Sequence, residues 1–156
     1  MSAQTSATNA MIQLVTCRIG GQLFAINLEM VEDVFKPEQY TPIPTVRPEI
    51  AGILNLRGRI IVAINTDQLL GLPAIAAPIV GRQMVNIKYL NESYGLLADS
   101  VGDVVTFSVD DIQPNPINLD GNLAIYSQGI LRLDGELTTV LMADKLIAKV
   151  LDQEAA

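Results

Sequence analysis

Residues 52–62 read GILNLRGRIIV, two β-rich runs on either side of Gly58. Such runs predict two strands joined by a tight turn, because glycine reaches the positive φ that the turn needs. Thr66 follows as a candidate N-cap for a short helix over 67–70, which Gly71 ends. The stretch therefore predicts a β-hairpin followed by a short helix.

The same pattern returns 77 residues later, where residues 129–139 read GILRLDGELTT. Laid over each other without gaps, residues 52–70 and 129–147 share Gly52/Gly129, Ile53/Ile130, Leu54/Leu131, Leu56/Leu133, Gly58/Gly135, Asp67/Asp144 and Leu69/Leu146. A weaker match, offset by 70, lays 24–35 over 94–105, and both copies contain Val-x-Asp-Val. Chance similarity between apolar strands is the alternative, but glycines matched at both ends of a hairpin favour a duplication.

Each copy of about 70 residues buries too little surface to be robust alone, so we expect two similar β-barrels packed together. Two further hairpins are expected, one over 14–27 across Gly20-Gly21 and one over 82–99, besides the hairpin over 129–142. Residues 29–35 permit one helical turn, because apolar residues recur at i, i+1 and i+4.

The chain is predicted to form one domain over 12–151, between a tail at 1–11 and a tail at 152–156. Its parts are a first lobe at about 12–71, a second lobe at about 81–142 and a C-terminal helix at 143–151, with apolar residues along one stripe. The sequence leaves open whether terminal strands are exchanged between the lobes.

Composition and charge exclude several classes of protein. Of the 156 residues, 49% are hydrophobic and 17% charged, which is typical of a folded chain and not of a disordered one. The net charge of −7 argues against a nucleic-acid partner. No apolar run reaches the roughly 18 residues that cross a bilayer, and the N-terminus lacks the basic start of a signal peptide. We expect a cytoplasmic protein without direct membrane insertion.

The sequence contains few of the residues that commonly act as nucleophiles or as general acids and bases. The chain has no histidine, and its single cysteine, Cys17, lies in a strand-forming run and is interpreted as a core residue. One enzymatic alternative remains, in which duplicated barrels each donate an aspartate to a shared acid–base site, with Asp33 and Asp103 as candidates. The acidic pair Glu32-Asp33 is interpreted more simply as a solvated face. We expect no catalytic residue, no metal and no cofactor, and therefore a protein that works by recognition.

The Asn-Leu-Arg-Gly centre of residues 52–62 resembles the signature of the CheW family of bacterial chemotaxis coupling proteins. The resemblance covers about 14–151, nearly the whole chain, and departs from the family where Ala63 replaces a common proline and Asn65 a common aspartate. Other matching segments follow in order: Gly20-Gly21 with Phe24-Ala25-Ile26, Val31-Glu32-Asp33-Val34, Thr41-Pro42-Ile43-Pro44, Gly95 to Val101, and Gly129-Ile130-Leu131.

This resemblance implies an all-β fold with short helices, made of two five-stranded SH3-like barrels around a shared hydrophobic core. It implies a non-catalytic adaptor, recruited to receptor arrays beneath the inner membrane. The adaptor would couple the cytoplasmic hairpin tip of chemoreceptors to the regulatory domain of the histidine kinase CheA. The residues that it assigns to receptor binding are Arg57, Gly52, Gly58, Val31 and Asp33.

The resemblance leaves the kinase-binding residues unassigned. An adaptor of another kinase array, such as one that governs twitching motility, carries the same motifs and stays an alternative. A carboxylate-dependent hydrolase on duplicated barrels is the weaker alternative, because the other acid–base groups that it needs are missing.

Overall fold

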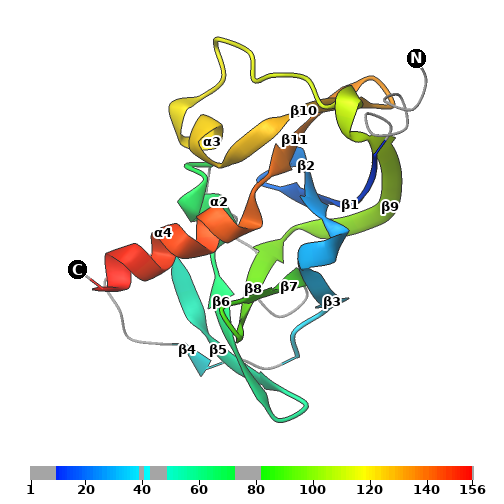
Figure 1. Ribbon diagram of the computed structural model, residues 1–156. Coiled ribbons are helices and arrows are strands. Elements are labelled where there is room, and N and C mark those ends of the chain that lie inside the picture. Colours follow the sequence, from blue (N-terminus) through cyan, green and yellow to red (C-terminus); the bar gives the residue numbers. More distant parts are fainter. Residues whose placement is uncertain (1–9, 39–40, 43–48, 73–81, 156) are drawn as a thin grey trace.

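The computed structural model describes residues 10–38, 41–42, 49–72 and 82–155, which form two β-sheets with short helices (Figure 1). The first sheet has five strands in the order β10-β11-β2-β1-β9, and the second has six in the order β3-β7-β8-β6-β5-β4. The strands of the first sheet are β1 (Met11–Ile19), β2 (Gln22–Asn27), β9 (Ser100–Ser108), β10 (Ser127–Leu133) and β11 (Glu136–Leu141). Those of the second are β3 (Val31–Phe35), β4 (Thr41–Pro42), β5 (Ile50–Leu56), β6 (Arg59–Ile64), β7 (Gln83–Tyr89) and β8 (Glu92–Ala98).

The helical segments connect the strands and close the chain. They are the 3-10 helices η1 (Leu28–Met30) and η2 (Val109–Asp111), and the α-helices α2 (Thr66–Leu69), α3 (Gly121–Tyr126) and α4 (Ala143–Ala155). The N-cap of α2 is Asn65 and not Thr66, which lies in the first turn. Within the described ranges, no helix is long and apolar enough to cross a membrane. The predicted all-β fold with short helices and a C-terminal helix is confirmed.

Strands are exchanged between the two halves of the chain. The hairpin β1–β2 lies in the first sheet, but β3 crosses to the second sheet and pairs with β7, while β9 crosses back and pairs with β1. The predicted division into lobes at about 12–71 and 81–142 is therefore wrong at the level of strands. The repeat explains the exchange, because β1 and β7 are equivalent strands and so are β3 and β9. Each of β1 and β7 pairs with the strand from the other copy, β1 with β9 and β7 with β3.

Strand registers show that the duplication is real. In the first sheet β2 and β11 run parallel, with Phe24 opposite Thr139, and in the second β8 and β6 run parallel, with Tyr94 opposite Val62. The two pairs are equivalent, because the offset of 70 relates Phe24 to Tyr94 and the offset of 77 relates Val62 to Thr139. The β-bulge at Gly52 in β5 also recurs at Gly129 in β10. Each barrel thus contains the same pairings in the same register.

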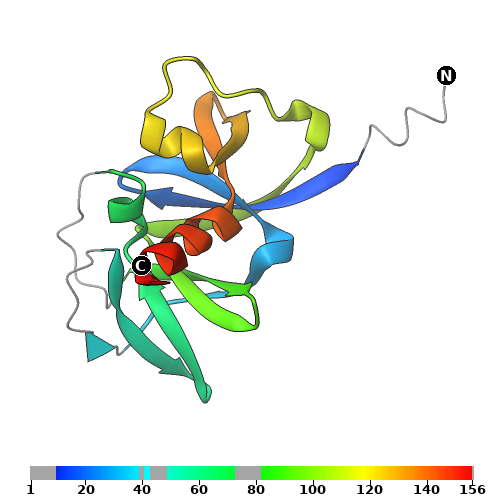
Figure 2. The same cartoon turned by 60° about the vertical axis from the view of Figure 1, so that its left-hand side comes forward.

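One large core lies between the barrels, and each barrel has a smaller core of its own. Helix α4 packs into the shared core through Leu146, Ile147 and Val150, which are all buried, as the predicted apolar stripe requires. Figure 2 shows α4 across the junction of the two sheets, which agrees with Figure 1. The two barrels therefore share one hydrophobic core.

The structure differs from the sequence prediction in one segment and contains one helix that the sequence pattern does not predict. Residues 29–35, predicted as a helical turn, form the end of η1 and then strand β3, in which burial alternates along the chain. Its copy β9 is likewise a strand. Residues 121–126, for which the sequence pattern predicts no element, form α3, where the Asp120 side chain caps the helix by accepting from the backbone amide of Asn122 at 2.8 Å.

Candidate protein-interaction site

The turn between β5 and β6 carries the first group of predicted site residues. Arg57 and Gly58 form this two-residue turn with φ of 54° and 82°, a conformation that favours glycine at the second position. The Asn55 side chain accepts a hydrogen bond from the Gly58 amide at 2.9 Å, which closes the turn. The hairpin extends away from the rest of the second sheet (Figure 1), and the Arg57 side chain is 77% exposed.

Strand β3 brings two acidic residues to this hairpin. Arg57 Nη1 lies 3.6 Å from Asp33 Oδ2, and Arg59 Nη2 lies 3.3 Å from Glu32 Oε2. Both acids are partly buried, with 35% of the Asp33 side chain and 23% of the Glu32 side chain exposed. Both residues keep part of their surface in solvent, so the interpretation as a solvated face is correct in part, but both are also ion-paired to the hairpin.

Glu32 is held more tightly than Asp33. Its Oε1 accepts hydrogen bonds from Asn86 Nδ2 on β7 at 3.3 Å and from Ser93 Oγ on β8 at 3.2 Å. Sequence reasoning missed Glu32 and Arg59 as parts of the site. The signal that could have found them is the pair of acids in 32–33 facing a second pair, of arginines, on either side of Gly58.

The other two predicted residues lie apart from the turn. Gly52 is buried at the β-bulge of β5, opposite Ala63 and Pro42. Val31 is partly buried and packs against the shared core. The structure thus brings Arg57, Gly58 and Asp33 together, whereas Gly52 shapes the strand that leads to the turn.

A groove of about 380 Å³ lies between β3 and β9, where the two exchanged strands approach each other. Val31, Asp33 and Val34 line it from β3, and Val101 and Val104 from β9. The two copies of the Val-x-Asp-Val motif therefore meet in one groove. Val34 and Val104 are exposed, which gives the groove an apolar surface beside Asp33.

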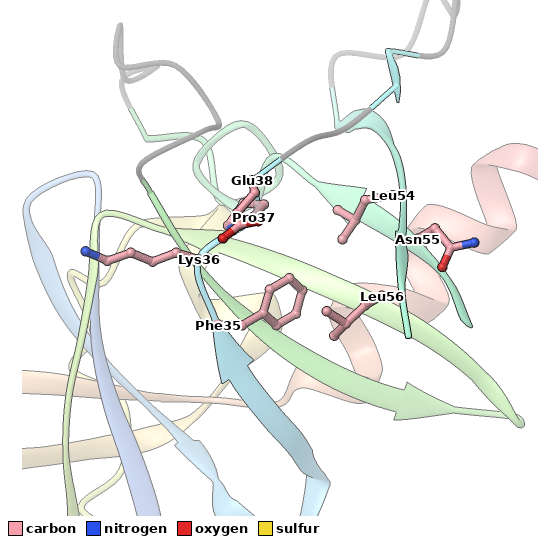
Figure 3. A pocket seen from close by; sticks show the side chains of 7 residues that line it. All are labelled: Phe35, Lys36, Pro37, Glu38, Leu54, Asn55 and Leu56. Atoms are coloured by element: carbon pink, nitrogen blue, oxygen red, sulfur yellow. The ribbon is translucent and has the colours of Figure 1, made fainter. Parts of the chain in front are cut away.

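A second hollow, of about 420 Å³, lies where the end of β3 faces β5 (Figure 3). The side chains of Phe35 and Leu56 point toward each other across it, while Asn55 turns away. Lys36, Pro37, Glu38 and Leu54 complete its lining. Because Leu54, Asn55 and Leu56 belong to β5, this hollow borders the hairpin directly, whereas the groove is connected to the hairpin through Asp33 and its contact with Arg57.

The acid–base alternative gains no support from these positions. Asp33 is paired with Arg57, and Asp103 is exposed on β9, where its backbone carbonyl accepts from Thr16 Oγ1 at 2.9 Å. Burial raises the pKa of the Cys17 thiol from 9.0 to about 12, and the nearby charge of Asp99 adds to the effect. A thiol with that pKa is protonated at neutral pH and is a poor nucleophile. Within the described residues, no cluster of three or more acidic, cysteine or histidine residues could hold a metal ion.

Comparisons with known proteins agree with this architecture. Residues 13–151 match the CheW family, described as a CheW-like domain. The "Chemotaxis protein CheW" of Rhizobium meliloti is 28% identical over 155 residues, 99% of each chain. "Protein PilI" of Pseudomonas aeruginosa is 26% identical over 114 residues, 72% of this chain and 63% of PilI. The crystal structure of "scaffolding protein TtCheW" from Thermoanaerobacter tengcongensis superposes with a TM-score of 0.76, at 24% identity over 88% of each chain. Because the family match spans almost the whole chain, this protein belongs to the CheW-like domain family.

Proposed function

We propose that the protein is a non-catalytic adaptor that couples chemoreceptors to a CheA-type histidine kinase in bacterial chemotaxis. The observation that carries the proposal is the family match over residues 13–151. It is supported by similarity to a chemotaxis protein CheW along the whole chain and by the fold that it shares with a scaffolding protein. The protein would work in the cytoplasm, at receptor arrays beneath the inner membrane, without a cofactor.

The receptor side of the adaptor is the surface around the β5–β6 turn. Receptor hairpin tips are helical, and a helix can lay an apolar stripe along the valines of the groove between β3 and β9. An acidic residue on that helix would then meet the exposed guanidinium of Arg57, which can form a bidentate contact. In this arrangement Val31 and Asp33 belong to the groove, while Gly58 shapes the turn and Gly52 the strand before it.

Titration calorimetry against the isolated regulatory domain of the candidate CheA-type kinase tests the adaptor function first. We expect saturable one-to-one binding. If both proteins are folded and no heat of binding appears, the assignment to that kinase is overturned. The other CheA-like kinases of the same genome then become the partners to measure.

An adaptor of a non-flagellar array is the second candidate, favoured by the similarity to PilI. The two functions differ in the partner and not in the fold, so binding to the kinases of both kinds of array separates them. Tighter binding to the kinase of a twitching-type array would assign the protein to that array instead.

A further inference from the structure

We infer that Glu32 is a positioning residue, which fixes the β5–β6 hairpin so that Arg57 stays beside Asp33 of the groove. This inference rests on the proposed receptor contact at Arg57. Glu32 joins three elements of the second barrel: its Oε2 pairs with Arg59 on β6, and its Oε1 accepts from Asn86 on β7 and Ser93 on β8. Asn86 and Ser93 are 2% and 5% exposed, so both donors are held by the barrel.

The fold itself does not require an acid at this position. The offset of 70 places Gly102 of β9 at the position of Glu32, and Thr16 at that of Asn86. In the first barrel Thr16 Oγ1 donates instead to the backbone carbonyl of Asp103. The β10–β11 hairpin there is held from β1, by Arg18 and Glu136. An equivalent barrel thus forms without the glutamate, which separates the role of Glu32 from folding.

The contacts of Glu32 with Arg59, Asn86 and Ser93 are called the clamp below. The clamp matters because Arg57 itself is weakly held. Its contact with Asp33 is 3.6 Å long and the side chain is 77% exposed, and ion pairs of this kind contribute little by themselves. Arg59 follows Arg57 by two residues, on the other side of Gly58. Holding Arg59 against Glu32 therefore fixes the base of the turn and limits the directions in which Arg57 can point.

Glu32→Gln in the full chain tests the clamp with little change in shape. The glutamine oxygen still accepts from Asn86 and Ser93, but the charge that faces Arg59 is lost. We expect faster hydrogen exchange of the Gly58 and Arg59 amides and an unchanged melting temperature. We also expect about three- to tenfold weaker binding to a soluble receptor cytoplasmic fragment. Arg59→Gln should act in the same way, and the double variant should lose no more than either single variant.

Two controls make the result specific. Glu29→Gln removes an exposed acid from η1 and should change neither exchange nor binding. In an Arg57→Ala background, Glu32→Gln should weaken receptor binding no further, because the clamp acts through Arg57.

Four results would overturn the inference. Unchanged exchange at the turn removes the clamp. An equal loss of binding in the Arg57→Ala background, or a lower melting temperature, assigns Glu32 a general structural role. Faster exchange with full receptor affinity, in both Glu32→Gln and Arg57→Glu, instead overturns the receptor contact itself, and with it the role of Glu32 there.

Discussion

Arg57 Nη1 lies 3.6 Å from Asp33 Oδ2, which joins the β5–β6 turn to strand β3 at the far edge of β7 in the same sheet. Asp33 also lines the groove between β3 and β9. The Arg57 side chain is mostly exposed, so its guanidinium can leave Asp33 for a stronger acceptor without unfolding any part of the barrel. The pair therefore neutralises both groups in the free protein and leaves the cation available to a partner.

Arg57→Glu should weaken binding of a receptor cytoplasmic fragment by about tenfold or more, equivalent to about 1.4 kcal/mol. The reversed charge repels an acidic residue on the partner and also lies beside Asp33 and Glu32. Affinity measured by calorimetry or by co-sedimentation with receptor fragments checks this. Arg132→Glu is the control, since it makes the same change of charge in the β10–β11 hairpin, two residues before Asp134, the residue that aligns with Arg57. Equal losses in the two variants would show a general effect of charge and remove Arg57 from the site.

Gly58→Ala and Gly135→Ala should lower the free energy of unfolding equally, by about 1 kcal/mol each. Both glycines have a φ of 82°, and a Cβ added to either meets nothing within 4 Å, so the cost is in the backbone alone. Only Gly58→Ala should also weaken receptor binding, because Gly58 shapes the turn that carries Arg57. Chemical denaturation and receptor titration on the same two variants measure both quantities. Equal effects on binding would contradict a specific role for the β5–β6 turn.

The hairpins could be predicted from the sequence because their turns are local. Gly20-Gly21, Arg57-Gly58 and Asp134-Gly135 all have positive φ, and each turn is fixed by neighbouring residues. The exchange of β3 and β9 could not be predicted. Val34 lies opposite Val85, and Val104 opposite Val15, so both copies offer the same partners in the same register. Whether β3 pairs with β1 or with β7 depends on the connecting segments and on packing, and the repeated sequence pattern is the same for both pairings.

The candidate site was predictable in part for a similar reason. Arg57 and Gly58 are neighbours in a recognisable motif, and Asp33 lies in the repeated Val-x-Asp-Val segment. The clamp of Glu32 depends on Asn86 and Ser93, which are 54 and 61 residues away along the chain. Only the pairing of β3 with β7, and of β7 with β8, brings these side chains together.

The contact between Arg18 and Glu136 should make stability depend on pH. Arg18 donates to both oxygens of Glu136, at 2.9 and 2.8 Å, and these bonds lower the pKa of the Glu136 carboxyl below its usual 4.5. A carboxyl whose pKa is lower in the folded state stabilises the fold at any pH above its pKa in the unfolded chain. This contribution is lost as the pH falls through the pKa of the folded state. The small difference in melting temperature between the wild type and Glu136→Gln should therefore be present at pH 7 and vanish in strong acid. Arg18→Gln should reproduce it, whereas a difference of equal size at pH 3 and pH 7 would contradict the assignment.

Leu146→Ala should destabilise both barrels together, by about 2–5 kcal/mol. Leu146 is fully buried on α4, in the core that the two sheets share, so the cavity removes contacts from both. Because the strands are also exchanged between the halves of the chain, neither barrel can lose its order while the other stays intact. Native-state hydrogen exchange should show amides of β2 and β8 losing protection by the same amount. Leu137→Ala, at a 52% exposed position on β11, should change the free energy of unfolding by no more than about 0.5 kcal/mol. Loss of protection confined to one sheet would mean that the barrels unfold separately, in spite of the exchanged strands and the common core.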